Sequence, residues 1–225
     1  MKWEDFPQDM KNDEVFFYYN IIKKKRLYFF LKRVSDVFFS VILFILFLPI
    51  ILIISLLIKI DSSGPIFFKQ ERITYYKKKF KIFKFRTMIE NAEKKGSSIT
   101  IKNDPRITKL GKLLRKFHFD EIPQIFNIMT GDMSFVGTRP EIEKYVVNYT
   151  NEMKATFLMP AGLTSFASIK FRNESDFLEK KKREDDVYIN EILPKKMKYN
   201  LLYLKKFSFL LDVEILFKTF FTFFY

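Results

Sequence analysis

The sequence predicts a mostly helical protein with a few short strands, in which an N-terminal re-entrant membrane helix hairpin precedes a small membrane-associated domain. Two observations support this fold class. Residues 37–58 form one apolar run of 22 residues in which Ser40 and Ser55 are the only polar side chains. Downstream, apolar residues recur at helical spacing, and only short segments have the composition of strands. We expect an N-terminal basic, interfacial segment at 1–33, a membrane helix at 34–61 and one domain at 62–225.

Composition limits the classes of site that the chain can carry. Its 225 residues are 48% apolar and 18% aromatic, which excludes a disordered chain. The absence of Cys and the single His exclude a disulfide framework, a thiol nucleophile and a His- or Cys-rich metal site. Any catalytic metal would be a hard, oxygen-ligated ion such as Mg²⁺. The net charge of +14 predicts an anionic partner: nucleic acid, anionic lipid or a phosphorylated substrate.

The apolar run is long enough to cross a bilayer core of about 30 Å. A signal peptide is disfavoured because 36 residues precede the run and no small-residue cleavage site follows it. Basic residues flank both ends, which favours the cytoplasm for both, and Pro49 predicts a kink at Leu48-Pro49. A hairpin that enters and leaves the cytoplasmic leaflet is therefore favoured over a single span, and a buried core helix is the third alternative. The flanking residues are Lys23, Lys24, Lys25, Arg26, Lys32 and Arg33 before the run, and Lys59, Lys69, Arg72, Lys77, Lys78 and Lys79 after it.

Two further segments have the composition of membrane-surface helices. Phe, Tyr and Lys crowd residues 18–33, which predicts a helix lying along the interface. Residues 215–225 are apolar, but this stretch of 11 residues is too short to cross a membrane.

The remaining elements follow from turns and periodicity. Gly64-Pro65 predicts a turn, and Asp120 is expected to cap a helix that has Pro123 in its first turn and ends at Gly131. Strands are predicted at 66–69 and 80–85, joined through Lys77-Lys78-Lys79, and helices at 89–95, 107–117, 122–129, 143–157 and 184–207, while 179–186 is a charge cluster.

Asp120-Glu121 is the pair that could carry chemistry. A helix start carries partial positive charge, which predicts that the Asp120 carboxylate is ionised. Two adjacent carboxylates can hold Mg²⁺ or divide the roles of metal ligand and nucleophile. The structural alternative is an ordinary cap followed by a first-turn Glu.

Basic residues surround this pair in the sequence. Arg139 lies in the loop Gly137-Thr138-Arg139-Pro140, which suits a guanidinium held for a phosphate. A carboxylate pair among cations fits phosphoryl transfer, whereas scattered surface charge is the alternative. The other basic residues are Lys69, Arg72, Lys84, Arg86, Arg106, Lys109, Lys112, Arg115 and Lys116.

These residues resemble the motifs of the monotopic phosphoglycosyl transferases, the bacterial sugar transferase family. The resemblance runs from about residue 30 to the end. Its motifs are Lys32 to Asp36, Gly64 to Ile73, Phe80 to Met88, Asn103 to Thr108, Leu113 to Gln124 with Asn127, Gly131 to Glu141, and Gly162 to Ser165 with Phe171 to Glu174.

The resemblance implies transfer of a sugar 1-phosphate from a UDP-sugar to undecaprenyl phosphate, with release of UMP. It implies that Asp120 attacks the phosphate nearer the sugar and forms a phosphoryl-aspartate, and that Glu121 holds Mg²⁺. Arg139 and Pro140, with Lys84, Arg86, Arg106 and Arg115, are the expected substrate-binding residues. The family also implies the inner membrane, with the domain on the cytoplasmic face. The sugar, the oligomeric state and the glycan (capsule, O-antigen, exopolysaccharide or glycoprotein) are left open.

The sequence departs from the family pattern at several positions. Leu48 replaces a Ser before the membrane-breaking Pro, Thr138 replaces the first Pro of Pro-Arg-Pro, and Thr74 stands where Gly is common. Relative to the family pattern, 160–164 contain one extra residue, and 165–168 differ from the usual version. None of these changes touches Asp120 or Glu121.

Two other functions compete with this one. A non-enzymatic membrane-surface module could use its positive charge to bind anionic lipid or nucleic acid, but it would need no carboxylate pair beside a fixed Arg. A transferase acting on a CDP-linked lipid would need several membrane spans and a repeated carboxylate motif. We therefore expect a membrane lipid partner and no nucleic acid partner.

Overall fold

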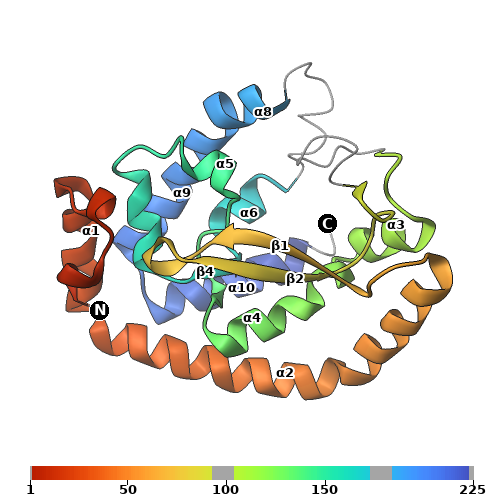
Figure 1. Ribbon diagram of the computed structural model, residues 1–225. Coiled ribbons are helices and arrows are strands. Elements are labelled where there is room, and N and C mark those ends of the chain that lie inside the picture. The colour runs from red at the N-terminus through yellow and green to blue at the C-terminus, as the bar shows by residue number, and fades with distance from the viewer. Residues whose placement is uncertain (1, 93–103, 173–183, 223–225) are drawn as a thin grey trace.

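The computed structural model describes residues 2–92, 104–172 and 184–222. In those residues the protein is mostly helical, with four strands in two two-stranded sheets, which confirms the predicted class at this level. Figure 1 shows the long helix α2 (Arg26–Asp61) along one edge of the molecule, with the other elements on one side of it.

Helix α1 (Asp13–Lys24) is separated from α2 at Lys25, so the single interfacial helix predicted at 18–33 is wrong. The Asn12 side chain accepts a hydrogen bond from the Val15 amide at 2.9 Å and begins α1. Val15, Tyr18 and Ile22 share one face of this helix and are buried in the main hydrophobic cluster. The helix is therefore part of the core rather than a free surface element.

Helix α2 begins at Arg26, eight residues before the predicted boundary, and continues as one helix through Pro49. Figure 1 shows that it bends, so that its C-terminal part turns toward the rest of the protein. Among the described residues it is the one helix long and apolar enough to cross a membrane, and only 17% of its most apolar 18-residue window is buried. The third alternative, a buried core helix, does not fit this exposure.

The first part of α2 is held to the protein by charged side chains. Lys32 Nζ donates a hydrogen bond to Asp212 Oδ2 at 2.6 Å, on helix α10 (Phe209–Thr222). Arg33 donates to the carbonyl oxygens of Ile128 and Met129 at 2.6 and 2.9 Å, at the end of helix α4 (Ile125–Thr130). Part of the basic flank before the apolar run therefore makes tertiary contacts.

The second part of α2 is held mainly by apolar packing. Ile51, Ile54 and Ile58 are buried in a cluster with Phe85 and Leu114. At the end of the helix, Arg86 donates to the carbonyl oxygens of Ser63 and Ser62, both at 2.6 Å. Gly64 has φ +115°, and a Cβ there would lie 2.1 Å from Arg86 Nη1, so this turn requires glycine.

Strands β1 (Phe67–Ile73) and β2 (Lys79–Phe85) form an antiparallel hairpin, in which Lys69 pairs with Phe83. Both predicted strands are confirmed, and both are longer than predicted. Tyr76 and Lys77 in the connecting turn have φ near +56°. The N-terminal segment supports this turn, since the Phe6 ring lies 4.5 Å from the Tyr76 ring and Asp9 pairs with Lys77.

The helices around Asp120 follow the predicted order with different boundaries. Helix α3 (Lys109–Lys116) lies within 107–117, and the expected single helix at 122–129 is divided into a 3₁₀ helix, η5 (Phe119–Gln124), and α4. Asp120 is the second residue of η5 and not its cap; His118, at φ +55°, precedes the helix. Gly131, at φ +94°, ends α4 as predicted.

Of the other predicted helices, one is confirmed and two are wrong. Residues 89–91 are not helical, with Asn91 at φ +58°, so the helix predicted at 89–95 is wrong there, whereas Ala92 is in a 3₁₀ helix and 93–95 lie outside the described residues. The helix at 143–157 is also wrong, because α5 (Glu143–Val146) and η6 (Met153–Leu158) are separate. The run at 184–207 is confirmed as α8 (Glu184–Val187), a π-helical turn (Tyr188–Ile192) before Pro194, and α9 (Leu193–Lys206). Most of the charge cluster at 179–186 lies outside the described residues.

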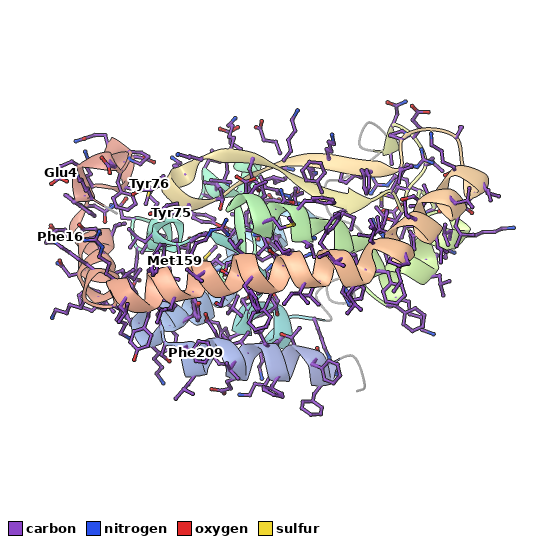
Figure 2. All side chains as sticks on the ribbon, turned by 90° about the horizontal axis from the view of Figure 1, so that it is seen from below. Glu4, Phe16, Tyr75, Tyr76, Met159 and Phe209 are labelled. Atoms are coloured by element: carbon purple, nitrogen blue, oxygen red, sulfur yellow. The ribbon has the colours of Figure 1, made fainter. Side chains whose placement is uncertain are left out.

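A parallel pair of strands, β3 (Met133–Val136) and β4 (Ala161–Thr164), was not predicted. It depends on close backbone approach, because a Cβ on Gly162 would lie 2.2 Å from the Gly137 backbone. The short helix α6 (Phe166–Lys170) follows β4, and α10 packs against both strands. Figure 2 shows α10 beside α2, and its exposed apolar side chains are Phe209, Leu210, Leu216, Phe217, Phe220 and Phe221.

Candidate active site

The Asp120-Glu121 pair is carried by η5, which packs against β2. The next helix, α4, is bonded to the same strand: Asn127 Oδ1 accepts from the Phe83 amide at 3.0 Å, and Nδ2 donates to the Lys81 carbonyl at 2.9 Å. Asn127 thus bonds the backbone of β2 as a neighbouring strand would. Because α4 directly follows η5 in the chain, these bonds also limit the movement of the carboxylate pair relative to β2.

Lys84 reaches the pair because of the alternation along β2. Phe80, Ile82 and Lys84 share one face of the strand, and Phe80 and Ile82 are buried in a cluster with Ile128 and Met133. Lys84 takes the next position on this inward face, and its Nζ lies 2.7 Å from Glu121 Oε1.

Arg139 approaches the same carboxylate from the loop after β3. Its Nη2 donates to Glu121 Oε1 at 2.5 Å, and its Nη1 lies 3.4 Å from Oε2. The backbone of the loop is fixed on both sides of Arg139: the Gly162 amide donates to the Thr138 carbonyl at 2.8 Å, and Arg72 donates to the Pro140 carbonyl at 3.2 Å.

Electrostatics separates the two carboxylates. Burial alone would raise the pKa of Glu121, but Arg139 and Lys84 hold this pKa well below its usual value. Burial lowers the pKa of Lys84, and Glu121 opposes that change. Arg139 has a raised pKa because of Glu121, against the effect of its own burial. Glu121 is therefore a fixed negative charge between two cations.

Asp120 is in a different environment. Its side chain is buried, and among the described residues no group donates a hydrogen bond to its carboxylate or pairs with it. Burial raises its pKa, while the nearby charge of Lys84 opposes this. The direction of this pKa shift is opposite to the effect of a helix start, because loss of solvent outweighs the helix terminus. That Asp120 is ionised at neutral pH stays a prediction. A desolvated carboxylate without hydrogen bonds is a more reactive nucleophile than a solvated one.

The other expected site residues lie at different places. Arg115 is close enough to Asp120 to influence its pKa, and its Nε donates to Thr87 Oγ1 at 2.8 Å. Arg106 bonds to Asp104 at 2.6 Å and to the Ala92 carbonyl. Arg86 bonds to the carbonyls at the end of α2. The structure thus brings Lys84, Arg139 and Arg115 to the carboxylates, while Arg86 and Arg106 are engaged elsewhere.

Metal ligands are few. No group of three or more His, Cys, Asp or Glu side chains gathers within the parts of the chain that are described. Mg²⁺ is commonly held by one or two carboxylates together with substrate phosphates and water. Adjacent Asp120 and Glu121 fit that donor set, although Lys84 and Arg139 contact Glu121 in this structure.

Three polar residues near the site were given no role from the sequence. Asn127 binds the backbone of β2, as described above. The Thr74 hydroxyl donates to the Asp132 carbonyl at 2.6 Å and accepts from the Ala161 amide at 3.0 Å, so it joins the hairpin to β3 and β4. Gln124 is almost fully buried, with neither amide atom bonded in the described structure. A polar residue within an otherwise apolar helix face was the available signal for Gln124 and Asn127.

Comparison with known proteins decides the family. The model of the family described as "Bacterial sugar transferase" matches residues 27–225. The chain belongs to the bacterial sugar transferase family. It is 34% identical over 186 residues to the uncharacterized sugar transferase EpsL of Bacillus subtilis, covering 83% of each chain. The family resemblance deduced from the motifs is confirmed, and residues 1–26 precede the matched region.

Two larger relatives have more specific names. The chain is 36% identical over 192 residues to a UDP-N-acetylgalactosamine-undecaprenyl-phosphate N-acetylgalactosaminephosphotransferase of Aeromonas hydrophila, covering 84% of this chain and 42% of the relative. It is 37% identical over 196 residues to a UDP-glucose:undecaprenyl-phosphate glucose-1-phosphate transferase of Klebsiella pneumoniae, covering 84% and 39%. The chain thus spans about two fifths of the length of these relatives.

Proposed function

We propose that this sugar transferase moves a sugar 1-phosphate from a UDP-sugar to undecaprenyl phosphate and releases UMP. The single observation that carries the proposal is the difference between the two carboxylates of the buried pair. Glu121 is bound by two cations, and the carboxylate of Asp120 beside it accepts no hydrogen bond from the described residues. The names of the Aeromonas and Klebsiella relatives support the substrate classes. The product would begin capsule, O-antigen, exopolysaccharide or glycoprotein glycan assembly.

The reaction proceeds in two displacements. An oxygen of Asp120 attacks the phosphorus nearer the sugar, a new phosphorus–oxygen bond forms, and the bond to the bridging oxygen breaks, so that its electron pair leaves with UMP. A terminal phosphate oxygen of undecaprenyl phosphate then attacks the same phosphorus. This second step returns the carboxylate of Asp120 and gives the polyprenyl-diphosphate-sugar.

The basic residues make attack by an anion on an anion possible. Arg139 and Lys84 already lie on the Glu121 side of the pair, where they can neutralise the diphosphate oxygens as charge moves toward UMP. Arg115 is close enough to Asp120 to assist, and Pro140 follows Arg139 in the same loop. Arg86 and Arg106 would reach substrate only by leaving the partners that they have in this structure. Glu121 would hold Mg²⁺, which would supply additional neutralisation of phosphate oxygens when bound.

The contacts of α2 support a re-entrant membrane arrangement. Both of its halves pack against the same domain, so neither end can extend a bilayer thickness away from it. A bent, re-entrant helix in the cytoplasmic leaflet satisfies these contacts, and the exposed apolar face of α10 would lie on the same surface. The catalytic domain would then work at the cytoplasmic face of the inner membrane, where the polyprenyl phosphate is accessible.

The deciding experiment measures UMP release by the detergent-purified chain with Mg²⁺, undecaprenyl phosphate and a panel of UDP-sugars. We expect turnover with at least one sugar and a burst of UMP, limited by the amount of enzyme, before lipid is added. Sequential kinetics without a burst would contradict the phosphoryl-aspartate, and absence of UMP with every sugar would favour the lipid-binding module.

A further inference from the structure

A second buried charge cluster is built on Glu141, two residues after Arg139 in the chain. Glu141 follows the Arg139-Pro140 dipeptide and is only 7% exposed. The hydroxyl of Tyr188 donates a hydrogen bond to Glu141 Oε1, and Lys196 Nζ lies 3.7 Å from the same oxygen. Arg72 Nη1 lies 3.9 Å from Glu141 Oε2. We call Glu141, Tyr188, Lys196 and Arg72 the rear cluster.

The rear cluster joins distant parts of the chain. Tyr188 begins the π-helical turn and Lys196 lies in α9, where its Nζ donates to the Tyr188 hydroxyl at 3.0 Å and lies 5.0 Å from the centre of the ring. Arg72 comes from β1 and also bonds to the Pro140 carbonyl. Two elements far apart in the sequence therefore bind the residues that immediately follow Arg139.

Two carboxylates influence Arg139. Glu121 bonds to its guanidinium, and the charge of Glu141, two residues along the chain, also raises the pKa of Arg139. Arg72 is close enough to repel Arg139, so Glu141 also screens one guanidinium from the other. Without Glu141, two like charges would remain in a poorly solvated site, which is costly.

We infer that Glu141, fixed by Tyr188 and Lys196, is a positioning residue that holds Arg139 in place for the substrate diphosphate. The inference rests on the proposed function, since it assigns the cluster to the residue expected to bind the diphosphate. A hydrogen bond to a buried carboxylate is stronger than one between neutral groups, and catalysis is sensitive to small displacements of a charged group. The rear cluster acts only through Arg139.

A double-mutant cycle tests the inference in the full-length chain. Tyr188→Phe and Glu141→Gln are each made in the wild-type and the Arg139→Lys backgrounds, and kcat/KM is measured by UMP release from the UDP-sugar that the panel identifies. We expect each change to lower kcat/KM about tenfold or more in the wild type and less than about twofold in Arg139→Lys, because a positioning residue has little left to position. Lys196→Arg should retain more activity than Lys196→Met.

Tyr203→Phe is the matched control, because it removes a bond from a buried Tyr to the carboxylate of Asp212, away from Arg139. It should change kcat/KM by less than about twofold in either background, with thermal unfolding checked for every variant. Equal losses from Tyr188→Phe and Glu141→Gln in the two backgrounds, or no loss in the wild type, would overturn the inference. Absence of UMP release by the unmodified chain would overturn the proposed function, and the inference with it.

Discussion

Two buried clusters among the described residues each bring a pair of carboxylates together with basic or hydroxyl groups, and they distribute their hydrogen-bond partners differently. At the α2–α10 junction, Asp212 accepts hydrogen bonds from Lys32 at 2.6 Å and Tyr203 at 2.7 Å, and Asp36 accepts one from the Phe135 amide at 3.3 Å. In the candidate site both cations bind Glu121, and Asp120 receives none of these bonds.

The comparison shows that the hydrogen-bond partners of a buried carboxylate decide whether it stabilises the fold or is left to react. Burial raises the pKa of both Asp120 and Asp212, so both pay for desolvation. Asp212 recovers stability through Lys32 and Tyr203, which join α2 and α10 to the domain. Asp120 receives from the described residues no hydrogen bond that offsets the cost of its desolvation, so both of its carboxylate oxygens are available to bond a substrate atom. Each prediction below changes one of the two clusters.

The largest effect is expected from Asp120→Asn. An amide is too poor a nucleophile, so turnover should fall by about 10⁴-fold or more, and the UMP burst should vanish. Because the raised pKa means that ionised Asp120 opposes folding near neutral pH, the unfolding temperature of the variant should equal or exceed that of the wild type. A variant that retains the burst would assign the nucleophile elsewhere.

Arg139→Lys should lower kcat/KM by about 10²-fold, and Arg139→Ala by at least as much. The lysine keeps the charge but loses the planar fork that binds Glu121 through two nitrogens. Steady-state UMP release measures the loss. Wild-type rates for Arg139→Lys would show that bulk positive charge is sufficient.

Glu121→Gln should slow turnover strongly, raise the Mg²⁺ concentration needed, and leave a folded protein. It removes the counter-ion of Lys84 and Arg139, so we expect a loss of about 2 kcal/mol of stability at neutral pH. The folded-state pKa of Glu121 lies below its usual 4.5, so this contribution is complete above that pH and disappears as pH falls toward the folded value. Denaturant unfolding of both proteins between pH 7 and pH 3 gives the difference, which should shrink at the acid end.

Lys32→Met changes the other cluster and should separate stability from chemistry. It leaves Asp212 buried without its cation, which should cost about 3 kcal/mol of stability. The kcat of the folded fraction should remain within about twofold of the wild-type value, because the pair does not contact Asp120 or Glu121. A large loss of kcat without a loss of stability would place this cluster in the reaction.

The last prediction concerns membrane topology, and the expected result is that neither of two engineered thiols is labelled from the periplasm. The chain has no Cys, so Arg26→Cys and Lys78→Cys each provide one exposed thiol, near the start of α2 and beyond its end. If both ends of α2 lie in the cytoplasm, an impermeant thiol reagent applied from the periplasm should label neither variant in intact cells. Permeabilised cells serve as the positive control, and labelling of one thiol in intact cells would indicate a spanning helix.

The sequence predicted the elements that depend on neighbouring residues. The apolar run became α2, the alternating segments became β1 and β2, and the pattern around Leu110 and Leu114 became α3. Predictions failed where a local pattern met a tertiary requirement: Lys25 separates α1 from α2, and the single helix expected at 143–157 gives way to α5 and η6. The parallel pairing of β3 and β4 could not be read locally, since its partners lie 28 residues apart.

By itself the sequence determined which groups are available: a carboxylate pair, a loop arginine, an apolar run long enough for a membrane, and the motifs of the family. Only the tertiary structure decided which of those groups pair with one another. It placed Lys84 and Arg139 on Glu121 rather than on Asp120, Arg86 at the end of α2, and Glu141 against Tyr188 and Lys196. Helical and strand periodicity act over a few residues, whereas ion pairing and desolvation depend on distances between residues that only folding brings together.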